Sequence, residues 1–314
     1  MPPKILVIVG PTASGKTRLA VELAHEWNGE VVSADSMQVY RRMDIGTAKP
    51  TAEEMDGIPH HMIDVADPGE DFSAARYVEM ASACVDGILA RGRLPIVAGG
   101  TGLYIDSLLS GRTFAAFSPD SPLRGELEAE LARRGGAAML EELARVDPET
   151  AARLHPNDNK RIVRALEVFQ QTGKTISQHN RETRALSPRY DALTLSLAFQ
   201  RREDMWARID RRVDEMMAAG LAEEVRALLD SGVPVRCTAM QAIGYKEMAA
   251  ALRGGGDVCA AAEEIKLRSR QYAKRQLTWF RRTEGAKWLF WGPEPDFEAA
   301  CRTSTKYLEE FGLV

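Results

Sequence analysis

At 314 residues the chain is longer than a single compact core, which stops growing near about 250–300 residues, and its 45% hydrophobic and 27% charged residues exclude a disordered protein. A net charge of −4 means that any nucleic acid must be held by local basic patches. The four cysteines form no C-x-x-C pair, which excludes a disulfide scaffold or a zinc ribbon. The apolar run at 5–9 is too short to span a membrane and lacks the features of a secretory leader. We therefore expect a cytoplasmic protein without membrane contact, and a monomer.

Strands and helices alternate over the first 110 residues. The unbroken apolar run Lys4–Val9 predicts a strand buried on both faces of a parallel sheet. A helix is expected over 17–27, a strand over 30–34, a helix over Ala74–Ala90 and a strand over 94–98. This order predicts an α/β fold built from βαβ units around a mostly parallel sheet.

Near residue 115 the strand-like runs give way to helix signals. Ser121-Pro122 and Asp147-Pro148 each join an N-cap residue to a proline at the first helical position, and Gly135-Gly136 and Gly173 end helices. These signals predict a helical insertion, after which a strand at 192–199 returns to the sheet and one near 287–291 closes it. The expected parts are a core at 1–114, an insertion at 115–190, and the rest of the core with C-terminal helices at 191–314.

A phosphate-binding motif lies between the first strand and the first helix. It fits G-x-x-x-x-G-K-[ST] at every fixed position, which predicts a P-loop NTPase-like core. Backbone N–H groups would surround a phosphate at the helix N-terminus, Lys16 adds a charge, and the Thr17 hydroxyl is the usual Mg²⁺ ligand. The alternative is a glycine turn beside a stray lysine. The predicted pyrophosphate- or nucleotide-binding residues are Gly10, Pro11, Thr12, Ala13, Ser14, Gly15, Lys16 and Thr17.

The motif does not reveal what carries the pyrophosphate. P-loop proteins that use ATP normally end a second apolar strand in Asp, which holds Mg²⁺. Here the third strand ends in Gly99-Gly100-Thr101-Gly102, and no N-K-x-D guanine signal is present. These features favour a pyrophosphate that leaves over a nucleotide that is hydrolysed.

Asp35 directly follows the second strand. Ligands of doubly wound sheets bind beyond the carboxyl ends of the strands, so Asp35 and Lys16 are expected on one rim, with Asp35 as a proton acceptor. The alternative is an Asx turn or a helix cap. Thr101, after the third strand, is either a turn residue or a hydrogen-bond partner of Asp35 or of the nucleophile.

Seven ordered blocks along the chain resemble the bacterial tRNA dimethylallyltransferase family, also called tRNA isopentenyltransferases. The blocks are GPTASGKT (10–17), DSMQVY with MDIGTAKP (35–50), PHHMID (59–64), GGTGLY (99–104), HPNDNKRIVRALEV (155–168), TAMQAIGYKE (238–247) and RQYAKRQLTWFR (270–281). The resemblance implies transfer of a dimethylallyl group from dimethylallyl pyrophosphate to the exocyclic amine of the adenosine immediately 3′ of the anticodon, with Mg²⁺ required. It also implies that the helical insertion grips the tRNA anticodon stem-loop.

The resemblance assigns residues to the tRNA. It implies that Asp35, Ser36, Met37, Gln38 and Thr101 lie at the extruded adenosine, and it places Asn159, Lys160, Arg161, Ile162 and Val163 in an RNA-contacting block. Met37, Gln38 and Gln241 are candidates for shaping the splayed loop.

A basic segment from Lys266 to Thr283 contains seven basic residues and no acidic one, including Lys274 and Arg275. On a helical wheel the apolar residues, Trp279 and Phe280 among them, fall on the other side. A solvated helix face is the alternative to a phosphate-backbone surface.

Two further pairs stay open. Arg208 and Arg212 share a helix face. The resemblance implies that one of them, preferentially Arg212, reaches the pyrophosphate, whereas salt bridges with Asp204 or Asp214 are the alternative. His60-His61 invites a metal site, but adjacent side chains diverge, which favours a structural role.

Three other functions compete with tRNA prenylation. A small-molecule kinase would use Asp35 to activate a hydroxyl, although the strand-end Asp is missing. A transferase that prenylates free AMP would leave the insertion and the basic helix without a purpose. A non-catalytic RNA-binding module would tolerate loss of Asp35.

Overall fold

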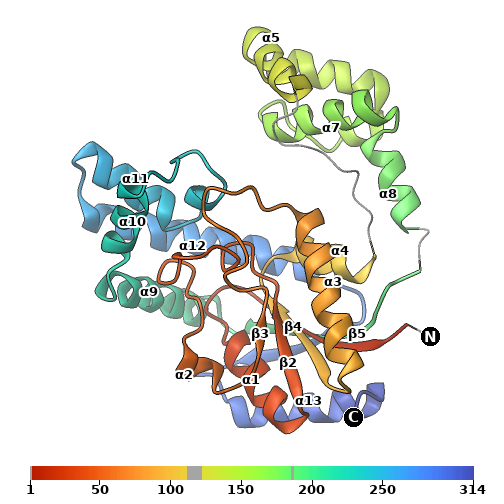
Figure 1. The fold of residues 1–314 in the computed structure, drawn as a ribbon, viewed down its shortest axis with the longest axis vertical. Helices are drawn as coiled ribbons and strands as arrows, with labels where there is room; N and C mark the ends of the chain where they lie inside the picture. Colours follow the sequence, from red (N-terminus) through yellow and green to blue (C-terminus); the bar gives the residue numbers. More distant parts are fainter. Residues whose placement is uncertain (1, 112–121, 185–186) are drawn as a thin grey trace. The chain divides into compact units, whose positions relative to one another are not determined.

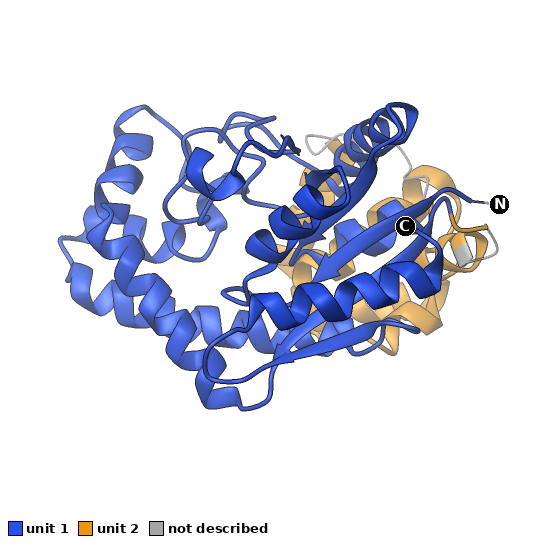
Figure 2. Cartoon of the chain, turned by 90° about the horizontal axis from the view of Figure 1, so that it is seen from below, with its two compact units in different colours: residues 1–109, 189–314 blue, residues 110–188 orange. Residues whose placement is uncertain are grey.

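The computed structural model describes residues 2–111, 122–184 and 187–314. The chain divides into two compact units, which Figure 2 colours separately: unit 1 comprises residues 1–109 and 189–314, and unit 2 comprises residues 110–188. The divisions lie a few residues from the expected boundaries at 114/115 and 190/191. The predicted N-cap Ser121 lies outside the described residues.

Six parallel strands form one sheet in unit 1, in the order β3-β2-β4-β1-β5-β6. Figure 1 labels β2, β3, β4 and β5 of this sheet. They are β1 (Lys4–Val9), β2 (Gly29–Ser33), β3 (His60–His61), β4 (Leu94–Gly99), β5 (Asp191–Phe199) and β6 (Lys287–Trp291). Leu6 of β1 pairs with Ile96 of β4 on one side and with Leu193 of β5 on the other. The predicted parallel α/β core is confirmed. Among the strands of the described residues, only the two-residue β3 was not predicted, because it is too short to show a pattern.

Helices cover both faces of this sheet. The crossover from β1 to β2 and the crossover from β3 to β4 run in opposite directions along the sheet, so right-handed connections place α1 and α3 on opposite faces. The helices of unit 1 are α1 (Lys16–Glu26), α2 (Ala52–Met55), α3 (Ala74–Ala90), α4 (Gly102–Leu109), α9 (Arg202–Ala218), α10 (Leu221–Asp230), the 3₁₀ turn η1 (Ala239–Gln241), α11 (Tyr245–Gly254), α12 (Val258–Phe280) and α13 (Phe297–Phe311).

The position of β1 explains where the site lies. Leu6 and Ile8 of β1 are fully buried and pack with Leu19 and Leu23 of α1 in one apolar cluster. In doubly wound sheets ligands bind beyond the carboxyl ends of the central strands. The loops after β1, β2 and β4 therefore meet at one rim.

The described residues of unit 2 form helices, as predicted. Its helices are α5 (Pro122–Val146), α6 (Pro148–Ala151), α7 (Asn159–Thr172) and α8 (Ile176–Arg184). Gly135, at φ 79°, interrupts α5 where the sequence predicts an end, but the helix resumes after it. The Asp147 carboxylate accepts a hydrogen bond from the Thr150 backbone N–H at 3.1 Å, which caps α6 as predicted.

The structure contains no helix, within the residues it describes, with the length and apolar character needed to span a bilayer.

Candidate active site

The phosphate loop folds tightly between β1 and α1. Gly15 has φ 79°, and a Cβ atom there would lie 2.6 Å from the Phe297 ring, so only glycine fits. The Ser14 hydroxyl donates to the Pro11 carbonyl at 2.8 Å and closes the loop on itself. The backbone thus forms a hollow at the N-terminus of an eleven-residue helix, where an anion is favoured.

Lys16 lies in this hollow with an amine that holds its proton weakly. Its Nζ donates to the Pro11 carbonyl at 2.7 Å. Burial, and then the nearby Arg212, lower the pKa of Lys16 to about 7, while Asp35 partly opposes them. Lys16 therefore changes charge near neutral pH.

Both arginines of α9 reach the phosphate loop. Arg212 donates to the Thr12 hydroxyl at 3.2 Å, and Arg208 donates to the Ala13 carbonyl at 3.2 Å. Burial lowers the pKa of Arg212, although Asp35 works against this. Neither arginine pairs with Asp204 or Asp214 in the described part of the chain, and Asp214 binds Lys266 instead. Arg212, together with Lys16, brings positive charge to the hollow, and Arg208 lines its outer part.

Asp35 makes the turn that the sequence left open as an alternative. Its Oδ1 accepts from the backbone N–H groups of Met37 at 2.8 Å and Gln38 at 3.3 Å. Asp35 also lines the cavity beside the phosphate loop, so its role in the turn is compatible with a role in the site. Thr101 does not bond Asp35; its hydroxyl accepts from the Ser36 backbone N–H at 3.0 Å and so ties the two loops together.

Gln276 of α12 is a buried residue of the site that the sequence did not single out. Its Oε1 accepts from the Thr12 backbone N–H at 2.9 Å, and its Nε2 donates to the Gly100 carbonyl at 3.0 Å. One side chain thus joins the loop after β1 to the loop after β4. Tyr272, one turn earlier, hydrogen-bonds Thr101 and Gln276, and burial keeps its hydroxyl protonated by raising its pKa to about 12. Sequence spacing gives no signal for contacts across 264 residues.

Two neighbouring cavities share part of their lining. The larger, of about 620 Å³, is lined by the phosphate loop, Asp35, Arg208, Arg212 and the segment from Asp44 to Glu54. The smaller, of about 310 Å³, has a more apolar lining. Its wall includes Ser36, Met37, Ile209, Val213, Met216, Gln241, Ile243, Ile265 and Arg275. Thr12, Asp35, Thr47, Arg212, Met216 and Tyr272 border both cavities. Asp35 therefore stands at their junction.

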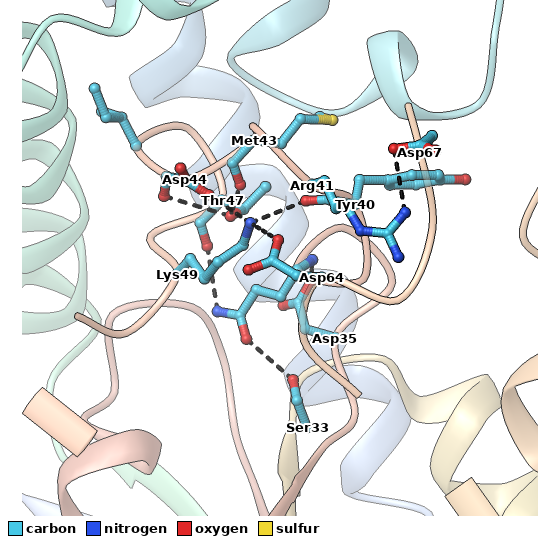
Figure 3. Close-up of polar contacts among 12 residues, drawn as sticks. Ser33, Asp35, Tyr40, Arg41, Met43, Asp44, Thr47, Lys49, Asp64 and Asp67 are labelled. Atoms are coloured by element: carbon cyan, nitrogen blue, oxygen red, sulfur yellow. Dashed lines mark hydrogen bonds and ion pairs between the residues drawn. The ribbon is translucent and has the colours of Figure 1, made fainter. Parts of the chain in front are cut away.

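A buried lysine fixes one wall of the larger cavity, formed by residues 44–54 (Figure 3). The Lys49 side chain is only 6% exposed, and its Nζ donates to the carboxylates of Asp44 and Asp64 and to the Tyr40 carbonyl. Gln38 is held in the same way, because its Oε1 accepts from Ser33 Oγ at 3.0 Å and its Nε2 donates to backbone carbonyls of the wall. The predicted tRNA-binding Gln38 is thus part of the scaffold that shapes the site.

Glu224 of α10 binds the first residues of the same wall, 44–46. Its carboxylate accepts from the backbone N–H groups of Asp44 and Ile45, each at 2.8 Å, and of Gly46 at 3.1 Å. The Tyr245 hydroxyl donates to it as well. Four donors on one carboxylate keep this loop in a single conformation.

The predicted tRNA-binding residues of unit 2 divide by exposure. Asn159, Lys160 and Arg161 are exposed in the first turn of α7. Ile162 and Val163 are 0% and 2% exposed and pack in the core of unit 2. The expectation that these two side chains contact RNA is corrected: they anchor the helix that presents the other three.

The basic surface of α12 is smaller than its sequence indicates. Lys266, Arg268 and Arg270 are neutralised by acidic residues of α12 and α9. No ion pair of Lys274, Arg275, Arg281 or Arg282 is found among the described residues. We call these four residues the basic cluster. The positive surface is therefore confined to the C-terminal end of the helix.

His60 and His61 make separate hydrogen bonds. His61 Nε2 lies 2.7 Å from Glu30 Oε2, and His60 Nδ1 lies 2.9 Å from the Ile58 carbonyl. Arg91 and Arg93 also bind Glu30, so His61 belongs to a structural cluster at the sheet edge. No group of three or more His, Cys, Asp or Glu side chains suited to a metal occurs within the described ranges.

Thr17 lines the larger cavity beside the phosphate loop. Mg²⁺ prefers oxygen ligands and is usually held by one or two protein groups together with substrate phosphates. The hydroxyl of Thr17 and the carboxylate of Asp35 in this cavity are oxygen donors of that kind, so the residues present fit such an ion.

Comparison with known proteins gives one consistent result. Residues 38–283 match the family model described as "IPP transferase". The chain is 45% identical to the tRNA dimethylallyltransferase of Acetivibrio thermocellus over 98% of both chains, and 50% identical to that of Geobacter sulfurreducens over 91% of both.

Solved structures agree. A tRNA isopentenylpyrophosphate transferase from Bacillus halodurans superposes with a TM-score of 0.73 at 42% identity over 98% of both chains. A eukaryotic dimethylallyltransferase whose structures capture it acting on tRNA gives a TM-score of 0.80 at 28% identity, over 98% of this chain and 78% of that one. These matches confirm the resemblance found in the sequence.

Proposed function

The chain belongs to the tRNA dimethylallyltransferase family, and on that premise we propose that it transfers a dimethylallyl group from dimethylallyl pyrophosphate to the exocyclic N6 amine of the adenosine immediately 3′ of the anticodon. A new bond joins N6 to the first carbon of the isoprenoid, and the bond from that carbon to the diphosphate oxygen breaks. The amine proton passes to a base, and pyrophosphate leaves.

The observation that carries the proposal is the position of Asp35, which borders both cavities. The larger cavity, with Lys16 and Arg212, suits the diphosphate. The smaller one, walled by Met37, Ile243 and other apolar groups together with Gln241, suits a flat adenine extruded from the anticodon loop. The carboxylate between them accepts the proton that the amine loses as its bond to carbon forms.

The other groups act on the leaving diphosphate. Backbone N–H groups of the phosphate loop, Lys16 and Arg212 stabilise the negative charge that develops on it. Thr17 would hold Mg²⁺, which when bound would add further positive charge to the same oxygens. Gln276 keeps the phosphate loop and the loop carrying Thr101 at a fixed separation.

The kinase alternative is less well supported. β4 ends at Gly99 and continues into Gly100 and Thr101, so no strand-end carboxylate lies where ATP-dependent P-loop enzymes hold Mg²⁺. Free AMP as acceptor would leave the exposed basic cluster and the exposed first turn of α7 without a partner.

A transfer assay tests the function directly. Purified protein, Mg²⁺ and labelled dimethylallyl pyrophosphate are incubated with unmodified tRNA, with AMP, or with ATP and no donor. Label in the tRNA, located by nucleoside mass spectrometry at the adenosine next to the anticodon, is the expected result. Label in AMP alone, or ATP hydrolysis without transfer, would refute the proposal.

The Asp35→Asn variant distinguishes the role of Asp35 as a base from its role in the turn. Asn keeps an oxygen that accepts from the Met37 and Gln38 N–H groups, but it cannot take the proton. We expect kcat to fall by at least about 100-fold while the dissociation constant for tRNA changes less than about threefold. Asp230→Asn, at an exposed helix end, is the matched control and should leave both constants unchanged. Equal activity of Asp35→Asn and the native enzyme would exclude Asp35 as the base.

A further inference from the structure

An exposed tryptophan lies beside the loop that carries Thr101. Trp279, in the last turn of α12, was expected on the apolar side of the helix with Phe280. Phe280 is 2% exposed, but Trp279 is 40% exposed. An indole that is exposed next to an active site offers its face to a ligand.

The indole is nevertheless held firmly. Helices α12 and α4 lie against each other (Figure 1), and the Trp279 ring rests on Gly102 at the start of α4. A Cβ atom at Gly102 would lie 2.4 Å from the Trp279 Cδ1 and Nε1 atoms, so only glycine admits the ring. Its N–H donates to the Asp106 carboxylate at 3.1 Å. The ring is therefore fixed before any ligand arrives.

Basic residues precede and follow the ring along the chain, and one of them borders the site. Arg275 precedes Trp279 by one helical turn and borders the smaller cavity together with Asp35. Arg282 follows just beyond the helix end and, like Arg275, belongs to the basic cluster. On the other side, Gly102 directly follows Thr101. An aromatic ring between cations that form no ion pair in the described part of the chain suits a nucleobase with its phosphates.

We propose that Trp279 is a stacking platform for the unpaired anticodon-loop base that flanks the reacting adenosine. This inference rests on the proposed function. Extrusion of one adenine removes a stacking neighbour from the next base, and the exposed indole replaces it. Trp279 thus binds tRNA without touching the reacting atoms.

The first test measures binding of a synthetic unmodified anticodon stem-loop. Trp279→Ala is expected to weaken binding and to raise the KM for tRNA about tenfold, with kcat and the KM for the donor nearly unchanged. Trp279→Phe keeps a stacking face and should stay within about threefold of the native enzyme, whereas Trp279→Leu should resemble Trp279→Ala. Phe290→Ala, at an exposed aromatic of β6, is the matched control and should bind normally.

A double-mutant cycle that combines abasic RNA with Trp279→Ala distinguishes stacking of Trp279 on a base from an effect of its packing against α4. Stem-loops lacking the base on either side of the target adenosine are bound to the native enzyme and to Trp279→Ala. One abasic site should weaken native binding about tenfold and have no further effect in the variant. Additive losses, or equal binding by the Leu and Phe variants, would overturn the platform. Failure of the native enzyme to prenylate any tRNA would instead refute the proposed function.

Discussion

Among individual residues, Lys16 shows most clearly how the site tunes its chemistry. Its amine is buried beside Arg212, which lowers its pKa to about 7. A lysine in solvent would stay charged well above this pH. Without a ligand, the side chain of Lys16 is therefore fully charged only below neutral pH. The negative charge of a bound diphosphate changes this.

This gives a pH dependence with a definite sign. The bound diphosphate raises the pKa of Lys16, so binding above pH 7 takes up a proton. Donor affinity should be greatest below about pH 7 and fall by up to about tenfold per pH unit as the pH rises toward the pKa of the complex. Calorimetry with a non-reactive diphosphate analogue between pH 7 and 9, in buffers of different ionisation enthalpy, measures both the affinity and the proton uptake.

Lys16→Arg is the control for this titration, because arginine keeps its charge throughout the range. Its affinity should be independent of pH between 7 and 9, with no proton uptake. A native affinity that is flat over this range, or an equal slope in the arginine variant, would show that another group is responsible.

At the scale of elements, α10 helps to determine the shape of the larger cavity, which is proposed to hold the diphosphate of the donor. Glu224 binds three consecutive backbone N–H groups of the loop from Asp44 to Gly46. The following residues, Thr47 and Lys49, line the cavity. Loss of the carboxylate should loosen this wall without removing any group that touches substrate.

Glu224→Gln is therefore expected to destabilise the fold and to weaken donor binding. The amide offers one acceptor to four donors and turns its NH₂ group toward an N–H. We expect the free energy of unfolding to fall by about 1.5–3 kcal/mol and the KM for the donor to rise, while the KM for tRNA changes less. Glu223→Gln, one residue away and exposed, should change stability by less than about 0.5 kcal/mol. Equal effects of the two substitutions, measured by denaturant unfolding, would contradict this role.

The elements also show what could be predicted from the sequence. The phosphate loop, the strands and the placement of Asp35 follow from local patterns, because a motif and its flanking strand and helix lie within about twenty residues. Glu224 and Gln276 were missed because each meets backbone groups of the site across more than 170 residues, with no spacing to mark the contact. The basic segment was overestimated for the same reason, since Asp210 and Asp214 of α9 neutralise part of it.

On the scale of the whole molecule, a protein of net charge −4 is proposed to bind a polyanion. If the charges of the protein were spread evenly over its surface, repulsion between the protein and the RNA would dominate. The charge is instead local: within the described residues, the basic cluster of unit 1 and the exposed first turn of α7 in unit 2 each bring together basic side chains that form no ion pair. Each cation that meets a phosphate releases counterions, so binding should weaken steeply with salt.

The salt dependence can be assigned to particular residues. Plotted as log affinity for tRNA against log salt concentration, the slope should become shallower by about one for each of Lys274→Ala and Arg282→Ala. Arg268→Ala lies on the same helix and removes the same charge, but Arg268 is paired with Glu264 at 2.6 Å, so it should leave the slope unchanged. Filter binding of unmodified tRNA between 50 and about 300 mM salt measures all three slopes. If Arg268→Ala flattened the slope as much as the other two, the overall charge of the protein, rather than the basic cluster, would control its affinity for tRNA.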